Sequence, residues 1–482
     1  ESNRVWKIGV DIGAVVKEAL APCLKELAAG IIKDDYDAYC DELVNHIVPL
    51  FEKMILDKNG EASNGSGIQK ESAAINYPKK TGNYALMDYL FAYDWRLSPM
   101  VVCDQLMAHI DRVKELTGKD KVVLIGRCMG ANMVSAYFTK YYDHAKDSID
   151  SFVMYEPSSL GLDLLGAIYS GQLSVDDKRL DEFLDYYLTH GNLIEDETMA
   201  ELVTVLVSIL QEARALGIAT DLINKLLEKV KDNLIPRLLL GTFGTFPSFW
   251  SMVCPEDVED AIALVYNTPE LQEEYAGMIE KIRSYHQNVQ LNAKETTLEC
   301  IEKGIDVMII SKYNFANFPL SDNSLLQSDS VASTTATSFG AVTSNFGETL
   351  SKSYLDSMSE ADKKYLSKDN MIDASKCLIP EKTWFFKNLY HDEFPPSVDK
   401  VIDTFLKTEN MTINTYAEYP QFMKYDKSTD TLTAVEGLDE GDIIVRGTVE
   451  TKLSAFMRFL TLIMNFLRKL FTGELDMGNL FG

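Results

Sequence analysis

An apolar run that stops at a cysteine framed by glycines constrains this chain most. Residues 122–125 are all branched and apolar, as in a strand buried on both faces, and residues 131–142 return to helical spacing. Between them lies the pentapeptide Gly126–Gly130, with the sequence Gly-Arg-Cys-Met-Gly. A sharp strand-to-helix turn with this spacing holds a nucleophile on strained backbone. The segment therefore predicts Cys128 as a nucleophile, against the alternative of a buried structural cysteine.

The same turn predicts part of an oxyanion site. Gly126 and Gly130 have no side chains, so neighbouring chain can pass close to the turn. The backbone N–H of Met129 falls at the start of the following helix, where free donors and the helix dipole favour a developing negative charge. Met129 is therefore the expected oxyanion donor.

Alternating strand and helix patterns predict an α/β fold with a mainly parallel sheet. The order is interrupted after residue 160, because residues 160–288 show helical spacing almost throughout. This stretch is expected to be a helical cap inserted into one sheet domain. Strands are predicted at residues 90–96, 122–125, 151–155, 305–310 and 383–386, helices at 100–116 and 131–142, and a polar loop at 333–338.

A nucleophile needs a base, and a group that orients the base. Among the six histidines, His391 follows the predicted strand at 383–386, whereas the other five lie in helical or helix-flanking stretches and are expected to be structural. The acid should follow the strand at 305–310. Asp322 and Asp329 both do, and Asp329 is preferred because it lies in a polar loop followed by small residues.

Charge and composition exclude several classes of function. The formal net charge of -27 argues against a nucleic-acid partner, because a phosphate backbone requires clustered Lys and Arg. The hydrophobic fraction of 46% and the charged fraction of 25% are those of a folded globular chain. The seven cysteines show no zinc-binding spacing, so neither a metal nor another cofactor is expected.

The C-terminal region contains an amphipathic, basic stretch at residues 453–471. Such a helix can lie on a membrane surface or dock on its own domain. No run of eighteen apolar residues is present, so a transmembrane helix is not expected. The chain opens as a processed protein would, and a secreted or cell-envelope location is expected, with the cytoplasm as the alternative.

Four segments in this order resemble bacterial α/β-hydrolases related to the lecithin:cholesterol acyltransferase-like lipases. They are Tyr93-Asp94-Trp95-Arg96, residues 121–130, Ser328-Asp329, and residues 383–392. The resemblance implies a carboxylic or lipid ester substrate, with Cys128 as nucleophile, His391 as base and Asp329 as orienting acid. Together with the residue patterns along the chain, this gives a hydrolase core at residues 68–160 and 301–425, a helical cap at 161–300, an N-terminal helical segment at 1–67 and a C-terminal extension at 426–482.

The chain departs from this family at two points. The family has serine where this chain has Cys128, and the glycine-rich oxyanion loop of the family is matched only poorly by residues 9–13. A thiolate can still be acylated, so an acyl-enzyme remains the first hypothesis. The alternatives are a catalytically silent hydrolase-fold protein that binds a lipid or a partner, a serine hydrolase whose nucleophile has been replaced, and a thioester or amide substrate.

Overall fold

The computed structural model of the protein describes residues 23–67, 89–183 and 220–443, apart from positions 24, 28, 64, 66 and 181. The chain divides into two compact units, Glu1–Asp439 and Glu440–Gly482. The strands and helices named below belong to the first unit. The predicted amphipathic stretch at 453–471 and the glycines at positions 9 and 13 lie outside the described residues.

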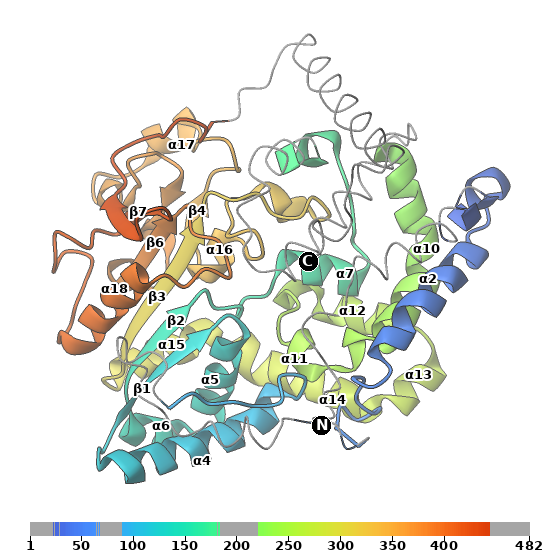
Figure 1. Cartoon of the computed structure of the whole chain (residues 1–482), viewed down its shortest axis with the longest axis horizontal. Coiled ribbons are helices and arrows are strands. Elements are labelled where there is room, and N and C mark those ends of the chain that lie inside the picture. Colours follow the sequence, from blue (N-terminus) through green and yellow to red (C-terminus); the bar gives the residue numbers. More distant parts are fainter. Residues whose placement is uncertain are drawn as a thin grey trace, which may run out of the picture. The chain divides into compact units, whose positions relative to one another are not determined.

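A six-stranded sheet forms the centre of the first unit (Figure 1). Its strands lie in the order β1-β2-β3-β6-β7-β8. The first five strands in this order are parallel to one another, and β8 is antiparallel to β7. The strands are β1 (Val122–Arg127), β2 (Ile149–Tyr155), β3 (Asp306–Tyr313), β6 (Thr383–Lys387), β7 (Phe422–Asp426) and β8 (Thr431–Ala434). The predicted α/β fold with a mainly parallel sheet is confirmed.

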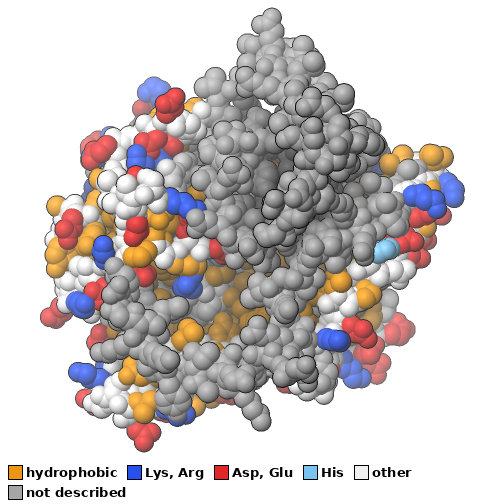
Figure 2. Space-filling view, viewed as in Figure 1, with side chains coloured by type: hydrophobic (Ala, Val, Ile, Leu, Met, Phe, Trp, Pro, Cys, Tyr) orange, Lys and Arg blue, Asp and Glu red, His pale blue; other side chains and the backbone are white. Residues whose placement is uncertain are grey.

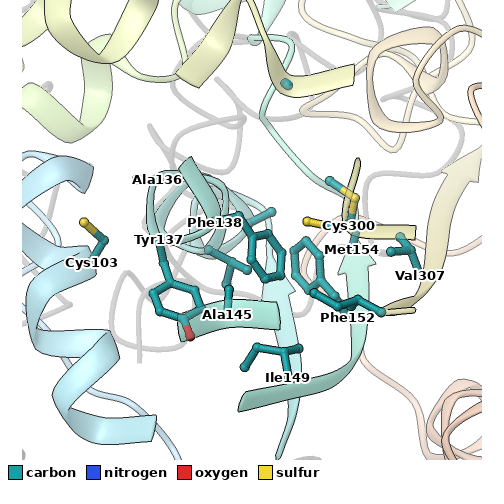
Figure 3. Close-up of a cluster of buried hydrophobic side chains, with 14 of the residues drawn as sticks. Cys103, Ala136, Tyr137, Phe138, Ala145, Ile149, Phe152, Met154, Cys300 and Val307 are labelled. Carbon is teal, nitrogen blue, oxygen red and sulfur yellow. The ribbon is translucent and has the colours of Figure 1, made fainter. Parts of the chain in front are cut away.

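Alternating side chains of the inner strands build one core on each face of the sheet. Phe152 and Met154 of β2 join a cluster with α4 (Pro99–Thr117), α5 (Met129–Lys140) and α15 (Ala293–Glu302) (Figure 3). Val153 and Tyr155 point to the other face. There they pack with Met308, Trp384 and the buried side of α18 (Pro396–Lys407).

Only helices and turns connect β2 to β3 in the described residues. We call this region the helical insert, residues 156–183 and 220–305. It has an apolar core of its own, in which Trp250 stacks on Tyr266 and meets the edge of Tyr169. Its main helices are α7 (Asp163–Ser170), α10 (Thr220–Leu240), α11 (Pro247–Trp250), α12 (Val258–Val265), α13 (Pro269–Glu274) and α14 (Ala276–Tyr285), which continues into the π-helical turn η4 (His286–Gln290).

The N-terminal helix α2 (Asp37–Phe51) packs along α10 of the helical insert (Figure 1). Tyr36 and Cys40 contact Val230 and Leu234 there. Shorter elements complete the described chain. They are α6 (Tyr142–Ser148), η2 (Phe243–Thr245), η3 (Pro255–Asp257), η5 (Asp322–Leu325), α16 (Thr334–Thr337), β4 (Val342–Thr343), α17 (Lys352–Ser357), η6 (Lys363–Tyr365), β5 (Ile372–Asp373), η7 (Ala374–Lys376) and η8 (Pro380–Lys382), with β4 and β5 antiparallel.

Two local predictions are wrong. Residues 90–96 form no strand; the guanidinium of Arg96 instead bonds the carboxylate of Asp94 through two nitrogens, at 2.9 and 2.6 Å, and donates to Met54 O at 2.7 Å. These side-chain bonds hold the segment in a turn. The loop predicted at 333–338 contains the short helix α16, because Ala336, Thr337 and Ser338 donate back to the residues that precede them.

Charged side chains of both signs are dispersed over the described part of the face in Figure 2. None of the described helices is long and apolar enough to cross a bilayer. The domain boundaries expected from the sequence stay predictions.

Candidate active site

Cys128 lies on a sharp turn between β1 and α5, as the sequence predicts. Its backbone has φ 45° and ψ -119°, a conformation that residues with a side chain rarely adopt. The Cys128 N–H donates to Tyr155 O at 3.0 Å, and Cys128 O accepts from the Ala131 N–H at 3.0 Å. Strand β2 on one side and helix α5 on the other thus hold the strained turn.

The two glycines of the turn have different roles. A Cβ added to Gly126 would lie 2.8 Å from Ala131 Cα and 3.0 Å from Ala131 N, so only glycine fits there. A Cβ added to Gly130 would meet nothing within 4 Å. The expectation that both glycines allow a close approach of neighbouring chain is therefore correct for Gly126 and wrong for Gly130.

Met129 is the first residue of α5, so its N–H has no acceptor within the helix. In the part of the chain that the structure describes, no backbone hydrogen bond uses this N–H. The Met129 side chain packs in a small apolar cluster with Leu162, Met252 and Ala332. A free donor and an apolar surface thus lie directly beside Cys128.

His391 and Asp329 are bonded to each other. The His391 ring nitrogen Nδ1 lies 2.8 Å from Asp329 Oδ2, and the His391 backbone N–H donates to Asp329 O at 3.0 Å. The other carboxylate oxygen of Asp329 accepts from the N–H groups of Val331, at 2.9 Å, and Ala332, at 2.7 Å. Burial raises the pKa of Asp329, but the charge and hydrogen bond of His391 outweigh burial and hold this pKa below its ordinary value.

The pKa of His391 depends on the charges around its ring, including a charge on Cys128. Burial lowers the pKa of His391, but the negative charges of Asp329, Glu156 and a Cys128 thiolate together hold it well above its ordinary value. In the described part of the chain, the imidazole is hydrogen-bonded to Asp329 and not to the Cys128 thiol, so only the charge of Cys128 acts on His391. Asp322, the alternative acid, is elsewhere: its exposed carboxylate pairs with Arg179 at 3.0 Å.

Sequence reasoning missed two charged residues of this site, Glu156 and Lys312. Glu156 directly follows β2, and its Oε2 lies 3.8 Å from His391 Nδ1. Lys312, in β3, is fully buried and lies 2.6 Å from Glu156 Oε1. Its ammonium also donates to the carbonyls of Tyr390, at 2.7 Å, and His391, at 2.9 Å. One available signal was the position of Glu156 at the carboxyl end of a predicted strand, where sites gather in parallel sheets.

His391, Asp329 and Glu156 offer ligand atoms that all lie within 4.8 Å of one another, a spacing that a metal ion could use. The buried ammonium of Lys312 already supplies a positive charge beside Glu156. Charge balance therefore does not require a metal here.

Four other histidines have structural partners. His46 bonds Glu42 O at 2.7 Å, His109 bonds Tyr89 O at 2.9 Å, and His286 bonds Gln290 Oε1 at 2.9 Å. His144 lies between Tyr137 and Asp111. His190 lies outside the described residues.

A strained residue between a parallel strand and a helix, an acid after a later strand, and a histidine after the next strand of the sheet define a fold of the α/β-hydrolase type. Residues 88–174 match the family described as Lecithin:cholesterol acyltransferase. The matched segment contains Asp94, Arg96 and the whole turn at Cys128. This match supports a related hydrolase. No curated protein and no solved structure matches the chain significantly.

Proposed function

We propose that this protein is a hydrolase or acyltransferase that acts on lipid-like carboxylic esters through an acyl-enzyme on Cys128. The observation that carries the proposal is the strained backbone of Cys128, at φ 45° and ψ -119°, within the segment that matches the acyltransferase family. The hydrogen bond between His391 and Asp329 supports it, because a base held by an acid is what a nucleophile requires.

In the proposed reaction the Cys128 sulfur attacks the ester carbonyl carbon, and the carbonyl oxygen becomes an oxyanion beside the Met129 N–H. The C–O bond then breaks, the alcohol leaves with a proton from His391, and a thioester remains on Cys128. Water, or the hydroxyl of an acceptor, attacks the thioester and gives its proton to His391. The C–S bond then breaks, the acid or new ester departs, and Cys128 and His391 return to their starting protonation states.

The surroundings of the turn support this choice of substrate class. The apolar cluster around Met129 contains Leu162 and Met252 of the helical insert and Ala332 of the loop that carries Asp329. Apolar side chains from both sides of the candidate site favour an acyl chain over a polar substrate. An ester of a long-chain acid is therefore proposed ahead of a small polar ester.

The test is hydrolysis of p-nitrophenyl esters of increasing acyl length by the parent chain, Cys128→Ala and Cys128→Ser. Cys300→Ala is the matched control, because it removes a thiol buried in α15. We expect turnover in the parent and the control, loss of it in Cys128→Ala, and faster turnover with the longer chains.

Unchanged turnover in Cys128→Ala would contradict the mechanism. An inactive parent with an active Cys128→Ser variant would identify a serine hydrolase whose nucleophile has been replaced. Absence of turnover in the parent chain and in all variants would favour a hydrolase-fold protein that binds a lipid or a partner.

A further inference from the structure

Two carboxylates, not one, face the same nitrogen of His391. Asp329 Oδ2 lies 2.8 Å from Nδ1, and Glu156 Oε2 lies 3.8 Å from the same atom. Both carboxylates are almost fully buried, with side-chain exposures of 1%. In a triad a single acid is enough to orient the histidine, so Glu156 is not explained by the proposed mechanism.

The backbone and its neighbours fix Glu156 in this position. Its φ is 49°, in the left-handed region, and its N–H donates to Ile310 O at 2.9 Å. The ammonium of Lys312 lies 2.6 Å from Oε1, the oxygen that does not approach His391. Lys312 therefore holds Oε1 by ion pairing, while its own hydrogen bonds go to the carbonyls of Tyr390, His391 and Glu393, and Oε2 is the oxygen nearer the imidazole.

We propose that Glu156 is a second acid partner of His391, which stabilises the imidazolium together with Asp329 and accepts the Nδ1 hydrogen bond when Asp329 is neutralised. Glu156 is a positioning residue, because it acts through His391. The inference rests on the proposed function in one respect, namely that His391 is the base for Cys128. The test of the inference needs no substrate.

Charged groups from four parts of the fold face Glu156. They are Lys312 on β3, His391 after β6, Asp329 after β3 and Arg127 at the end of β1. The hydroxyl of Tyr155 is also close enough to interact. Burial raises the pKa of Glu156 to about 7, because the opposing effects of Lys312 and His391 do not offset burial fully. Near neutral pH, His391 therefore faces one or two negative charges, depending on the proton of Glu156.

The experiment is a pH titration of the histidine ring signals by NMR, on the full chain labelled in histidine, with His391→Gln to assign the signal. We expect Glu156→Gln to lower the pKa of His391 by about one unit or more, because a negative charge about 4 Å away is removed. Glu156→Asp, which keeps the charge, should restore part of the shift. An unchanged pKa of His391 in Glu156→Gln would overturn the proposal.

Asp369→Asn is the matched control. Asp369 is a fully buried carboxylate that pairs with the fully buried Lys387 at 3.1 Å, at the end of the neighbouring strand β6. Its loss also disturbs a buried ion pair, although Lys387 keeps Asp439 at 3.4 Å, and should leave the pKa of His391 unchanged. If Asp369→Asn shifts His391 as much as Glu156→Gln, the effect of Glu156 is general disturbance of the fold, and the proposal fails.

Asp329→Asn tests the second half of the proposal. We expect His391 in this variant to keep a pKa above about 6.5, because Glu156 remains, and to fall to that value or below in Asp329→Asn/Glu156→Gln. Equal values in the single and double variants would contradict it. Should Glu156→Gln not fold, the parent provides a further readout: its His391 signal should show an additional inflection near pH 7, and a single-step titration would count against the proposal.

Because these titrations are made without ester, they separate two failures. Absence of ester turnover in the parent chain, together with a His391 pKa that falls in Glu156→Gln, would reject the proposed function alone. Turnover in the parent chain, together with a His391 pKa that stays unchanged in Glu156→Gln, would reject the role of Glu156 alone.

Discussion

At the scale of single residues, the strained turn of Cys128 depends on what lies behind it. Cys128 adopts φ 45° because β2 and α5 both bond its backbone, and Gly126 allows Ala131 to approach. Strain of this kind typically costs 1–3 kcal/mol and persists only where neighbouring structure imposes it. The neighbours of the turn should therefore be more sensitive to substitution than the exposed surface.

Gly126→Ala should lower the free energy of unfolding by about 1–3 kcal/mol, because the new methyl group would press on the backbone of Ala131. Gly130→Ala should instead be neutral or stabilising by up to about 1 kcal/mol, since the space is open and alanine favours a helix. Urea denaturation of both variants checks this prediction. Equal destabilisation by the two substitutions would mean that Gly126 is not crowded as described.

Glu156 should make the stability of the fold depend on pH. Its pKa is raised from 4.5 to about 7 in the folded chain. Between these values the folded state holds a proton that the unfolded state has released, so stability falls as pH rises and the full loss is reached above pH 7. Glu156→Gln removes this dependence. Relative to the parent, the variant should therefore gain on the order of 2–3 kcal/mol between pH 4.5 and pH 8.

Thermal or urea denaturation across this pH range measures the gain. Glu360→Gln is the control for the loss of an exposed carboxylate, because the Glu360 side chain is 88% exposed. A difference between Glu156→Gln and the parent that does not change with pH would show that burial does not shift the pKa of Glu156.

The sequence predicts those site residues whose chemistry is tied to a local pattern. Cys128 has its glycines and its apolar strand, and His391 follows an apolar strand as well. Asp329 could be separated from Asp322 only by the composition of its loop. Glu156 and Lys312 have no such pattern. The role of a lysine near the end of an apolar strand cannot be predicted until β3 is known to pair with β2, because this pairing brings Lys312 to Glu156.

At the scale of elements, a buried polar group joins α5 to the helical insert. Asn132 is fully buried; its Nδ2 donates to Ser251 O and Ser251 Oγ, both at 3.1 Å, and its Oδ1 accepts from Ser159 Oγ at 3.1 Å. Asn132 is the fourth residue after Cys128 along the chain. The helix that begins at the candidate nucleophile is thus joined to the insert by hydrogen bonds whose side chains are all buried away from water.

Asn132→Ala should lower the free energy of unfolding by about 1–3 kcal/mol, because the partners in Ser251 and Ser159 remain buried without it. Ser135→Ala on the same helix is the control. Among the described residues, its hydroxyl bonds Ala131 O alone, at 3.0 Å and within α5, so its loss should cost less than about 1 kcal/mol. Chemical denaturation compares the two. A larger effect for Ser135→Ala would contradict the role of the polar group.

Elements with a repeating apolar pattern could be predicted, and those held by specific side chains could not. Strands β1, β2, β3 and β6 each contain an apolar run of three or more residues, and α4 and α5 have helical spacing. Residues 90–96 also read as a strand, but Asp94 and Arg96 bond each other and fold this segment into a turn. The pattern of apolar residues carries no signal of such a contact.

At the scale of the whole molecule, the fold protects its thiols unequally. All seven cysteines lie in the described residues, and six of them are buried, whereas Cys128 is partly exposed. Iodoacetamide should therefore modify one thiol per folded chain and seven in guanidinium chloride. In Cys128→Ala, iodoacetamide should modify no thiol in the folded chain and six thiols in guanidinium chloride. Intact-mass spectrometry gives the counts, and rapid modification of a second thiol in the folded parent would contradict the packing described here.

The helical insert separates two strand pairs that must meet in one sheet, with Tyr155 of β2 beside Ile310 of β3. Joining them closes a long loop, but the entropy of loop closure grows only with the logarithm of its length, and a doubled loop costs only about 0.6 kcal/mol more. Away from Glu156, Ser159 and Ser251, residues between these strands can therefore be added or removed at small cost to the sheet. On the proposed function, the acyl specificity can change in the insert while the geometry at Cys128, Asp329 and His391 stays as it is.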